Sequence, residues 1–417
     1  MLRKILVSLM IAYFFAGCSS NSVDVAVKQN INNDFLKENH YIFGKLTDEQ
    51  KLEDYEYMWK TLKVSFPFFG VASRLGIDVN GIEKEYEEKV KESRGDIEFL
   101  KCINDCICNF TKIGHLSVLN TGLYEYVKDT FKDYPMRESW YNVINNPKTK
   151  KLYSNLRNIE KKLGNTNFVQ SEYKNGVNNV TTKIICPYEI AYIKINIFLQ
   201  EFVQTDYKII ADFFREVSDY KNLIIDITDN GGGADYYWMQ NIVAPLIKNK
   251  LSFTQYLLFS SSSNNDPYIQ DSGISINSKT IDELPHFNNI NEDDLKLFTN
   301  FFSSELSVEP GENNIDFNGK IWTLVNENVY SASDSFSEFC VATHFSTLIG
   351  ERTGGDGIGI DPVYLILPNS GLAIRYSMLY GLNLDGSSNQ EFGTTPDYIS
   401  NDGESPLDTC LKLIEMQ

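Results

Sequence analysis

The chain has 417 residues and a formal net charge of −18, with 42% hydrophobic and 23% charged residues. This composition is typical of a folded protein and excludes a disordered chain, and the acidic excess disfavours binding to nucleic acid. The length exceeds the roughly 250–300 residues of one hydrophobic core, so two or three domains are expected.

The N-terminus has the order of parts of a secretory signal. Two basic residues precede an apolar run from Ile5 to Phe15, and small residues then lead to Cys18. The run is too short for a permanent helix across a bilayer of about 30 Å. The ending Phe-Ala-Gly-Cys18 resembles a bacterial lipobox, which implies removal of residues 1–17, a lipid on Cys18 and attachment to the membrane of the bacterial cell envelope. A signal cut elsewhere, with loss of Cys18, is the alternative.

Polar residues 18–45 are interpreted as a tether from the lipid to the folded part of the chain. Residues 46–119 predict a helical domain, in which Thr47 caps the first helix. Its helices are expected near 46–66, 82–93 and 96–109. Residues 120–182 carry helical stretches such as 152–163, but no domain is assigned to them.

Three cysteines, Cys102, Cys106 and Cys108, lie close in sequence to His115, so a zinc site has to be considered. They fall on an apolar helical pattern, where buried free cysteine is ordinary. No second cysteine pair at a known zinc-site spacing accompanies them. We therefore predict no metal and no other cofactor.

Residues 183–417 change to alternating strand and helix patterns, which favour an α/β core with parallel strand pairs. The run Leu223–Ile227 is continuously apolar, as in a strand covered on both faces. Residues 260–300 are polar and are expected to form loops. Other strands are expected at 190–195, 321–325 and from 348, and helices at 206–217, 236–246 and from 332.

The first candidate for chemistry is Ser331, placed between a buried strand and a helix that begins near Ala332. At a helix start the hydroxyl lies beside backbone N–H groups without intrahelical acceptors. The helix dipole there favours the negative charge of a tetrahedral intermediate. Taken alone, this segment is explained more simply if Ser331 or Ser333 is a helix N-cap.

Two further segments carry possible chemistry. Three glycines in Asp229–Gly233 directly follow a buried strand, and their N–H groups could supply half of an oxyanion hole. A tight turn is the plainer interpretation. His115 could act as a general base near neutral pH, although a surface or capping histidine is the ordinary alternative. His344 is a poor rival, because a thirteen-residue helical separation from Ser331 corresponds to roughly 20 Å.

Together these segments resemble serine peptidase family 41, which includes the tail-specific peptidases, the tricorn core protease and the interphotoreceptor retinoid-binding protein repeats. The resemblance implies a crotonase-like core, a spiral of ββα units, beside the helical N-terminal domain. It implies that Ser331 is the nucleophile and that the N–H of Ala332, with that of Gly232 or Gly233, forms the oxyanion hole. The motifs that carry it, in the family's order, are Phe99–Val118, Leu223–Gly233, Ser331–Asp334, Ile349–Gly355 and Gly393–Asp397.

One departure from the family pattern concerns the catalytic base. Tail-specific peptidases use a lysine where this chain has Asp356, so no serine–lysine dyad can form there. The resemblance then points to the tricorn-like branch, with His115 as base and a carboxylate to orient its ring. Glu391 is the candidate for that carboxylate, although it lies one residue from the family position. Asp334 and Glu351 also match family positions and are interpreted as structural.

The sequence therefore predicts a lipid-anchored serine endopeptidase, with Ser331 and His115 as its working pair. Its substrates are expected to be peptides or unfolded protein segments. A ligand-binding or peptide-binding lipoprotein on the same fold is one alternative, since the retinoid-binding repeats carry ligands. An esterase or other acyl hydrolase that uses the same residues is another.

Overall fold

The computed structural model describes residues 45–162, 178–312 and 314–416. The predicted signal segment 1–17, Cys18 and the tether up to residue 44 lie outside the described residues. The described chain divides into two units. The helical unit comprises 45–162, 260–278 and 360–378, and the sheet unit comprises 178–259, 279–359 and 379–416.

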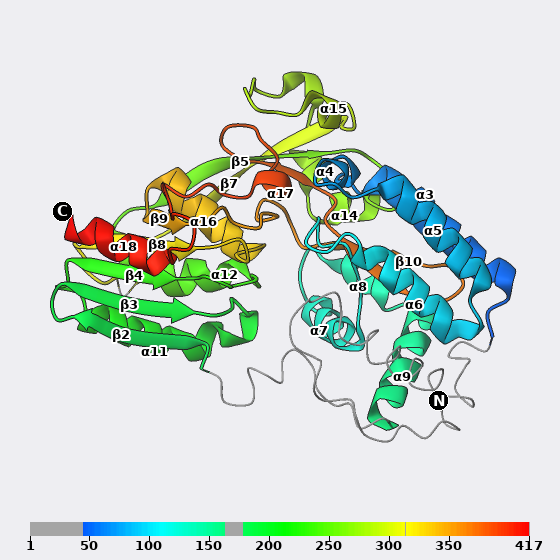
Figure 1. Ribbon diagram of the computed structural model, residues 1–417, viewed down its shortest axis with the longest axis horizontal. Helices are drawn as coiled ribbons and strands as arrows, with labels where there is room; N and C mark the ends of the chain where they lie inside the picture. The colour runs from blue at the N-terminus through cyan, green and yellow to red at the C-terminus, as the bar shows by residue number, and fades with distance from the viewer. Residues whose placement is uncertain (1–44, 163–177, 313, 417) are drawn as a thin grey trace. The chain divides into compact units, whose positions relative to one another are not determined.

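The three helices predicted within 46–119 are confirmed, and residues 120–162 are also mainly helical (Figure 1). Thr47 caps the first helix as expected, because it accepts from Gln50 N at 3.2 Å while the Gln50 side chain accepts from Thr47 N at 3.0 Å. The helices are α3 (Asp48–Ser65), α4 (Phe69–Arg74), α5 (Val79–Glu92), α6 (Gly95–Cys108), α7 (Thr121–Phe131), α8 (Glu138–Ile144), α9 (Pro147–Lys162) and α14 (Asp266–Asp271).

The helical unit also contains a three-stranded antiparallel sheet that brings distant segments together. Its strand order is β1 (Ser117–Val118), β11 (Ala373–Tyr376), β10 (Val363–Ile366). Asp54 of α3 fixes the β10–β11 turn, since its carboxylate accepts from the N–H groups of Asn369 at 2.7 Å and Ser370 at 2.8 Å. The predicted core of 183–417 is therefore not one continuous unit, because residues 260–278 and 360–378 cluster with the helices.

A six-stranded sheet forms the centre of the sheet unit. Its order is β13 (Tyr398–Ile399), β9 (Thr347–Gly350), β8 (Lys320–Val325), β4 (Asn222–Asp226), β3 (Ile190–Ile195), β2 (Val180–Cys186). All neighbouring strands run parallel except β2 and β3. Because β4 and β8 are parallel neighbours, the chain leaves both at the same edge of the sheet, which places the glycine loop beside the segment that leads to Ser331.

Both faces of this sheet are covered, as predicted for Leu223–Ile227. Leu223 and Ile225 belong to the core beneath α11 (Val203–Glu216) and α16 (Ala332–Thr343), whereas Ile224 packs with α18 (Pro406–Glu415) on the other face (Figure 1). The predicted helix 236–246 is interrupted. It consists of α12 (Asp235–Trp238), a π-helical turn (Met239–Val243) and α13 (Ala244–Leu246).

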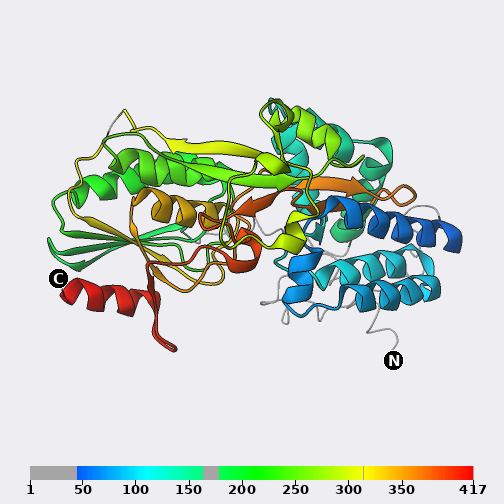
Figure 2. The same cartoon turned by 90° about the horizontal axis from the view of Figure 1, so that it is seen from above.

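A second sheet in this unit was not predicted. Its order is β12 (Tyr380–Leu382), β5 (Leu251–Phe259), β7 (Asn300–Val308), β6 (Lys279–Thr280), all antiparallel. The long β5–β7 pair is seen in Figure 2. Within the predicted loop region the chain forms β6 and the short helices α14 and α15 (Glu292–Leu295) instead. Over the described ranges no helix has the length and apolar character needed to cross a membrane.

Candidate active site

Ser331 stands directly before α16 in a backbone conformation that side chains rarely adopt. Its φ is +59° and its ψ is −128°. Such strain costs of order 1–3 kcal/mol and persists only because the surrounding structure imposes it. The Ser331 N–H donates to Gly355 O at 3.0 Å, which helps to hold the turn. Although Ser331 occupies the N-cap position, its side chain makes no capping hydrogen bond. The simple N-cap interpretation of this serine is therefore wrong for its side chain.

The glycine loop lies against this serine. A Cβ placed on Gly232 would be 2.6 Å from Tyr330 O, 2.9 Å from Ser331 Cβ and 3.0 Å from Ala332 N. Gly232 also has a φ of +101°, so both the close approach and the backbone require glycine. The structure thus brings together three of the predicted site residues, Gly232, Ser331 and Ala332.

The two glycines differ in what their amides can do. The Gly232 N–H donates to Asn230 Oδ1 at 3.0 Å, so it is already used. The Gly232 carbonyl accepts from Phe198 N at 2.9 Å, and a trans peptide points the next N–H the opposite way. The Gly233 N–H therefore points away from Phe198. Of the two glycine candidates for an oxyanion hole, Gly233 is the one whose amide is available beside that of Ala332, the first residue of α16.

His115 lies in the helical unit, on the turn after α6, with a φ of +51°. Its Nδ1 is 3.1 Å from Ser377 Oγ, and Ser377 N donates to Gly114 O at 2.6 Å. If Nδ1 carries the ring proton, it donates to Ser377 and leaves Nε2 as the acceptor that a general base needs. Because His115 and Ser331 belong to different units, their pairing stays a prediction.

The position of the missing lysine is close to the nucleophile segment. Tyr330 and Gly355 form a β-bridge, and the next residue, Asp356, accepts a hydrogen bond from Tyr330 Oη at 2.9 Å. Gln390 also approaches this hydroxyl, with 3.5 Å between Oε1 and Oη. Glu391 is the next residue of α17 (Asn389–Phe392) and is partly buried. Its role as the orienting carboxylate stays a prediction.

A buried carboxylate ties the surrounding loops to the first turn of α16. Asp334 accepts from Asn389 Nδ2 and Thr394 Oγ1, both at 2.8 Å, from Gly357 N and Thr394 N, both at 3.2 Å, and from Thr353 Oγ1. Burial raises the pKa of Asp334, and these hydrogen bonds act against that rise. The structural role predicted for Asp334 thus has a physical basis.

Of the three cysteines considered for zinc, Cys108 is disulfide-bonded and the other two have a disfavoured thiolate form. Burial raises the pKa of the Cys102 thiol to about 11 and that of Cys106 to about 12, so both are protonated at neutral pH. Zinc needs thiolates. Within 45–162, 178–312 and 314–416, no three histidine, cysteine or carboxylate side chains converge as metal ligands would.

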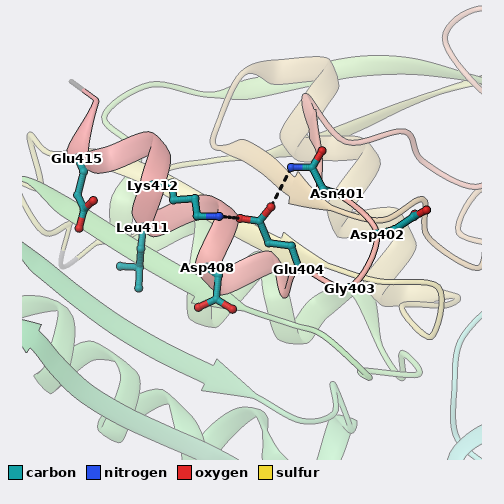
Figure 3. Close-up of a pocket in the computed structure, with 8 residues that line it drawn as sticks. All are labelled: Asn401, Asp402, Gly403, Glu404, Asp408, Leu411, Lys412 and Glu415. Carbon is teal, nitrogen blue, oxygen red and sulfur yellow. Dashed lines mark hydrogen bonds and ion pairs between the residues drawn. The ribbon is translucent and has the colours of Figure 1, made fainter.

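A surface hollow beside α18 is lined mainly by polar and charged residues (Figure 3). In it Glu404 accepts from Asn401 Nδ2 at 2.9 Å and pairs with Lys412 Nζ at 2.7 Å. These contacts fix the turn before α18 to the helix. The hollow contains none of the predicted site residues.

Several residues near the predicted site were missed by sequence reasoning. Ser377 and Gln390 are ordinary polar residues whose partners lie far away in the sequence. Asn230 and Ser333 lie inside predicted segments, but the contact between them spans 103 positions. The contact between His115 and Ser377 spans 262 positions. Only the sequence adjacency of Asn230 to the glycines could have drawn attention to it.

A strained serine at a helix start, beside a glycine loop at the carboxyl edge of a parallel sheet, defines the class as a serine hydrolase on a mixed α/β fold. The sequence model of peptidase family S41 matches residues 189–400, just over half of the chain. The chain belongs to this family and is thus a serine-type peptidase by class. Ser331, the glycine loop and Glu391 lie inside the matched segment, and His115 lies outside it.

The fold is shared with solved structures over most of its length. A protein from Parabacteroides merdae assigned as a peptidase is 18% identical, with a TM-score of 0.53, and the match covers 87% of this chain and 96% of that one. Mature CPAF complexed with lactacystin is 12% identical, with a TM-score of 0.54 and coverage of 88% and 97%. At these identities the likeness establishes the fold, and it confirms the α/β core with a helical N-terminal region. No curated protein matches the chain.

Proposed function

We propose that this protein is a lipid-anchored serine endopeptidase that cleaves extended or unfolded segments of other proteins. The observation that carries the proposal is the strained Ser331 packed against Gly232, beside the Ala332 amide at the start of α16. In the proposed reaction Ser331 Oγ attacks the peptide carbonyl while His115 takes its proton. The amides of Gly233 and Ala332 stabilise the oxyanion. Ser377 Oγ, 3.1 Å from Nδ1, orients the His115 ring as the structure stands, and Glu391 would take that role by replacing Ser377 at Nδ1.

The remaining steps follow from proton balance. Collapse of the intermediate breaks the C–N bond, and the departing amine receives the proton from His115. Water then attacks the acyl group on Ser331 as His115 accepts its proton, and the second collapse restores the serine hydroxyl. No metal or cofactor takes part in this scheme.

Labelling with a fluorophosphonate probe tests the pair directly. Wild type should label, Ser331→Ala should not, and His115→Ala should label roughly 10²–10⁴-fold more slowly because the general base is gone. His344→Asn is the matched histidine control, because His344 ends α16 in a left-handed conformation that asparagine tolerates. Equal labelling of all four proteins would overturn the assignment.

Hydrolysis of peptide and ester substrates decides between the peptidase and its alternatives. A peptidase should cleave an unfolded protein such as reduced casein in a Ser331-dependent way. Turnover of esters alone would favour an acyl hydrolase. A stable complex with an uncleaved peptide would favour a binding protein.

The lipid anchor rests on the sequence of residues 1–18 and needs its own test. Wild type expressed in a bacterium should incorporate radioactive palmitate and enter the detergent phase of Triton X-114. Cys18→Ser should do neither, because acylation requires the thiol. Detergent partitioning of Cys18→Ser equal to that of wild type would contradict the proposal.

A further inference from the structure

Asn230 joins three parts of the sheet unit through one fully buried side chain. Its Oδ1 accepts from Gly232 N at 3.0 Å and from Ser333 Oγ at 2.6 Å, and its Nδ2 donates to Ile195 O at 3.1 Å. It therefore connects the glycine loop, the first turn of α16 and the end of β3. We infer that Asn230 and Ser333 are positioning residues that set the Gly233 amide for the oxyanion, an inference that rests on the proposed function.

We call the three hydrogen bonds of the Asn230 side chain, to Gly232, Ser333 and Ile195, the clamp. The clamp is specific because each polar atom of the amide has its own partners. A side-chain carbonyl has two lone pairs, and here the Gly232 amide and the Ser333 hydroxyl use them both. The two donors come from the two segments that must meet for catalysis. Since the side chains of Asn230 and Ser333 are fully buried, bulk water does not compete for their hydrogen bonds, and the contact favours one loop geometry.

The clamp reaches the Gly233 amide through the peptide planes on either side of Gly232. Asn230 Oδ1 fixes the N–H of Gly232, and Phe198 N, at 2.9 Å, fixes its carbonyl. With both planes held and a φ of +101° between them, the direction of the Gly233 N–H is determined. Release of the Asn230 contact would free the first plane to rotate about the Gly232 N–Cα bond. The second plane, which carries the Gly233 N–H, would then be held from the Phe198 side alone.

The backbone of Asn230 supports the same arrangement from the nucleophile side. Tyr330 N donates to Asn230 O at 3.3 Å, and Ser333 N donates to Tyr330 O at 3.2 Å. The residues on both sides of Ser331 are thus bonded, directly or through one neighbour, to Asn230. The distance between the nucleophile and the glycine loop is set by these bonds.

The experiment measures kinact and KI for fluorophosphonate labelling, and kcat and KM for p-nitrophenyl acetate, in full-length protein. Ser333→Ala should lower kinact and kcat about 10-fold, and Asn230→Ala roughly 10²-fold, the range for loss of one oxyanion donor. KI and KM should change less than about 2-fold, because the clamp acts on the charged intermediate. Ser333→Thr, which keeps a hydroxyl donor, should recover part of kinact.

Ser337→Ala is the matched control. Ser337 lies one turn further along α16, is fully buried, and its hydroxyl donates to Ser333 O at 2.8 Å instead of to the loop. Its kinact should stay within about 2-fold of wild type although the thermal midpoint falls as for Ser333→Ala. If Ser333→Ala and Ser337→Ala have equal kinact, or if KI rises as kinact falls, the clamp is overturned while the proposed function stands. Absence of any Ser331-dependent labelling would overturn both.

Discussion

Two buried carboxylates lie one turn apart on α16, and their surroundings differ. Asp334 has five hydrogen-bond donors around it, whereas Glu338 receives one hydrogen bond, from Gln255 Nε2 at 3.1 Å. Burial raises the pKa of Glu338 well above its usual range, and the Asp334 charge adds to that rise. Of these two carboxyl groups, Glu338 is therefore the one that carries a proton.

This assignment predicts a pH-dependent stability. Below the unfolded-state pKa of about 4.3, Glu338 is protonated in both states and its contribution to the free energy of unfolding is fully present. As the pH rises toward the higher folded-state pKa, only the unfolded chain loses the proton, and this contribution is lost. The loss is at most about 1.4 kcal/mol per pH unit for one proton. Glu338→Gln, which cannot ionise, should be more stable than wild type at pH 8 and nearly equal to it at pH 4.5.

Thermal midpoints measured between pH 4.5 and pH 8 check this prediction. Glu309→Gln is the control, because that side chain is 70% exposed. It should follow wild type at every pH. Parallel pH profiles for Glu338→Gln and wild type would show that Glu338 does not titrate in this range.

Gly232 offers a second prediction at the scale of one residue. Gly232→Ala places a methyl group within 2.6 Å of Tyr330 O in a backbone conformation that alanine rarely adopts. We expect a loss of about 1–3 kcal/mol in stability and at least a 100-fold loss of Ser331 labelling. Gly231→Ala is the matched control, since a Cβ there meets nothing within 4 Å. Equal labelling of the two variants would contradict the packing of Gly232 against the nucleophile.

The site residues could be predicted where residues with recognisable chemistry are neighbours in the sequence. Ser331 and Ala332 are neighbours, and the glycine loop could be placed beside them because both follow parallel strands. Ser377 could not be found in this way, because its link to His115 depends on how β11 returns to the α6 turn. The Gly232 amide is occupied because it donates to the Asn230 side chain, which leaves the Gly233 amide available. No spacing rule predicts the contact between Asn230 and Gly232.

At the scale of elements, helices and buried parallel strands were predicted well, because their apolar residues repeat at a regular period. The β5–β7 pair was missed. In β5 the alternation of buried and exposed residues gives way to the continuous apolar end Leu257–Phe259, and a polar stretch follows it. Antiparallel pairing across about forty intervening residues leaves no local signal.

The attachment of α3 to the β10–β11 turn gives an element-scale prediction. Asp54→Asn replaces one acceptor oxygen by an NH₂ group that faces a backbone N–H of Asn369 or Ser370. The variant should lose about 1–3 kcal/mol, the cost of a buried donor left unpaired. Chemical denaturation monitored by tryptophan fluorescence measures the change.

The neighbouring carboxylate supplies the control for this prediction. Glu53 contacts Asn369 Nδ2 at 2.9 Å on the exposed side of the same helix. Glu53→Gln should therefore stay within about 0.5 kcal/mol of wild type. A loss as large as that of Asp54→Asn would contradict the prediction, because it would show that the Asn369 side-chain contact holds the turn as firmly as the Asp54 carboxylate does.

At the scale of the whole molecule, the chain passes between the two units several times. The segment that matches the family, 189–400, therefore includes 260–278 and 360–378, which belong to the helical unit. Within that unit these segments have buried partners from the N-terminal part of the chain. Trp140 Nε1 donates to Pro362 O at 3.0 Å, and the Trp140 ring meets Tyr268 edge-on at 4.7 Å between centroids.

A chain that begins at Asn178 keeps all of the family-matched segment but loses these partners. It should lack cooperative unfolding and bind a hydrophobic dye such as ANS, because β10, β11 and α14 would expose apolar faces that helices otherwise cover. A chain that begins at Lys45 keeps every described contact and is the control. It should unfold cooperatively and label at Ser331. Cooperative unfolding of the chain from Asn178 would show that the family-matched segment folds without the helices.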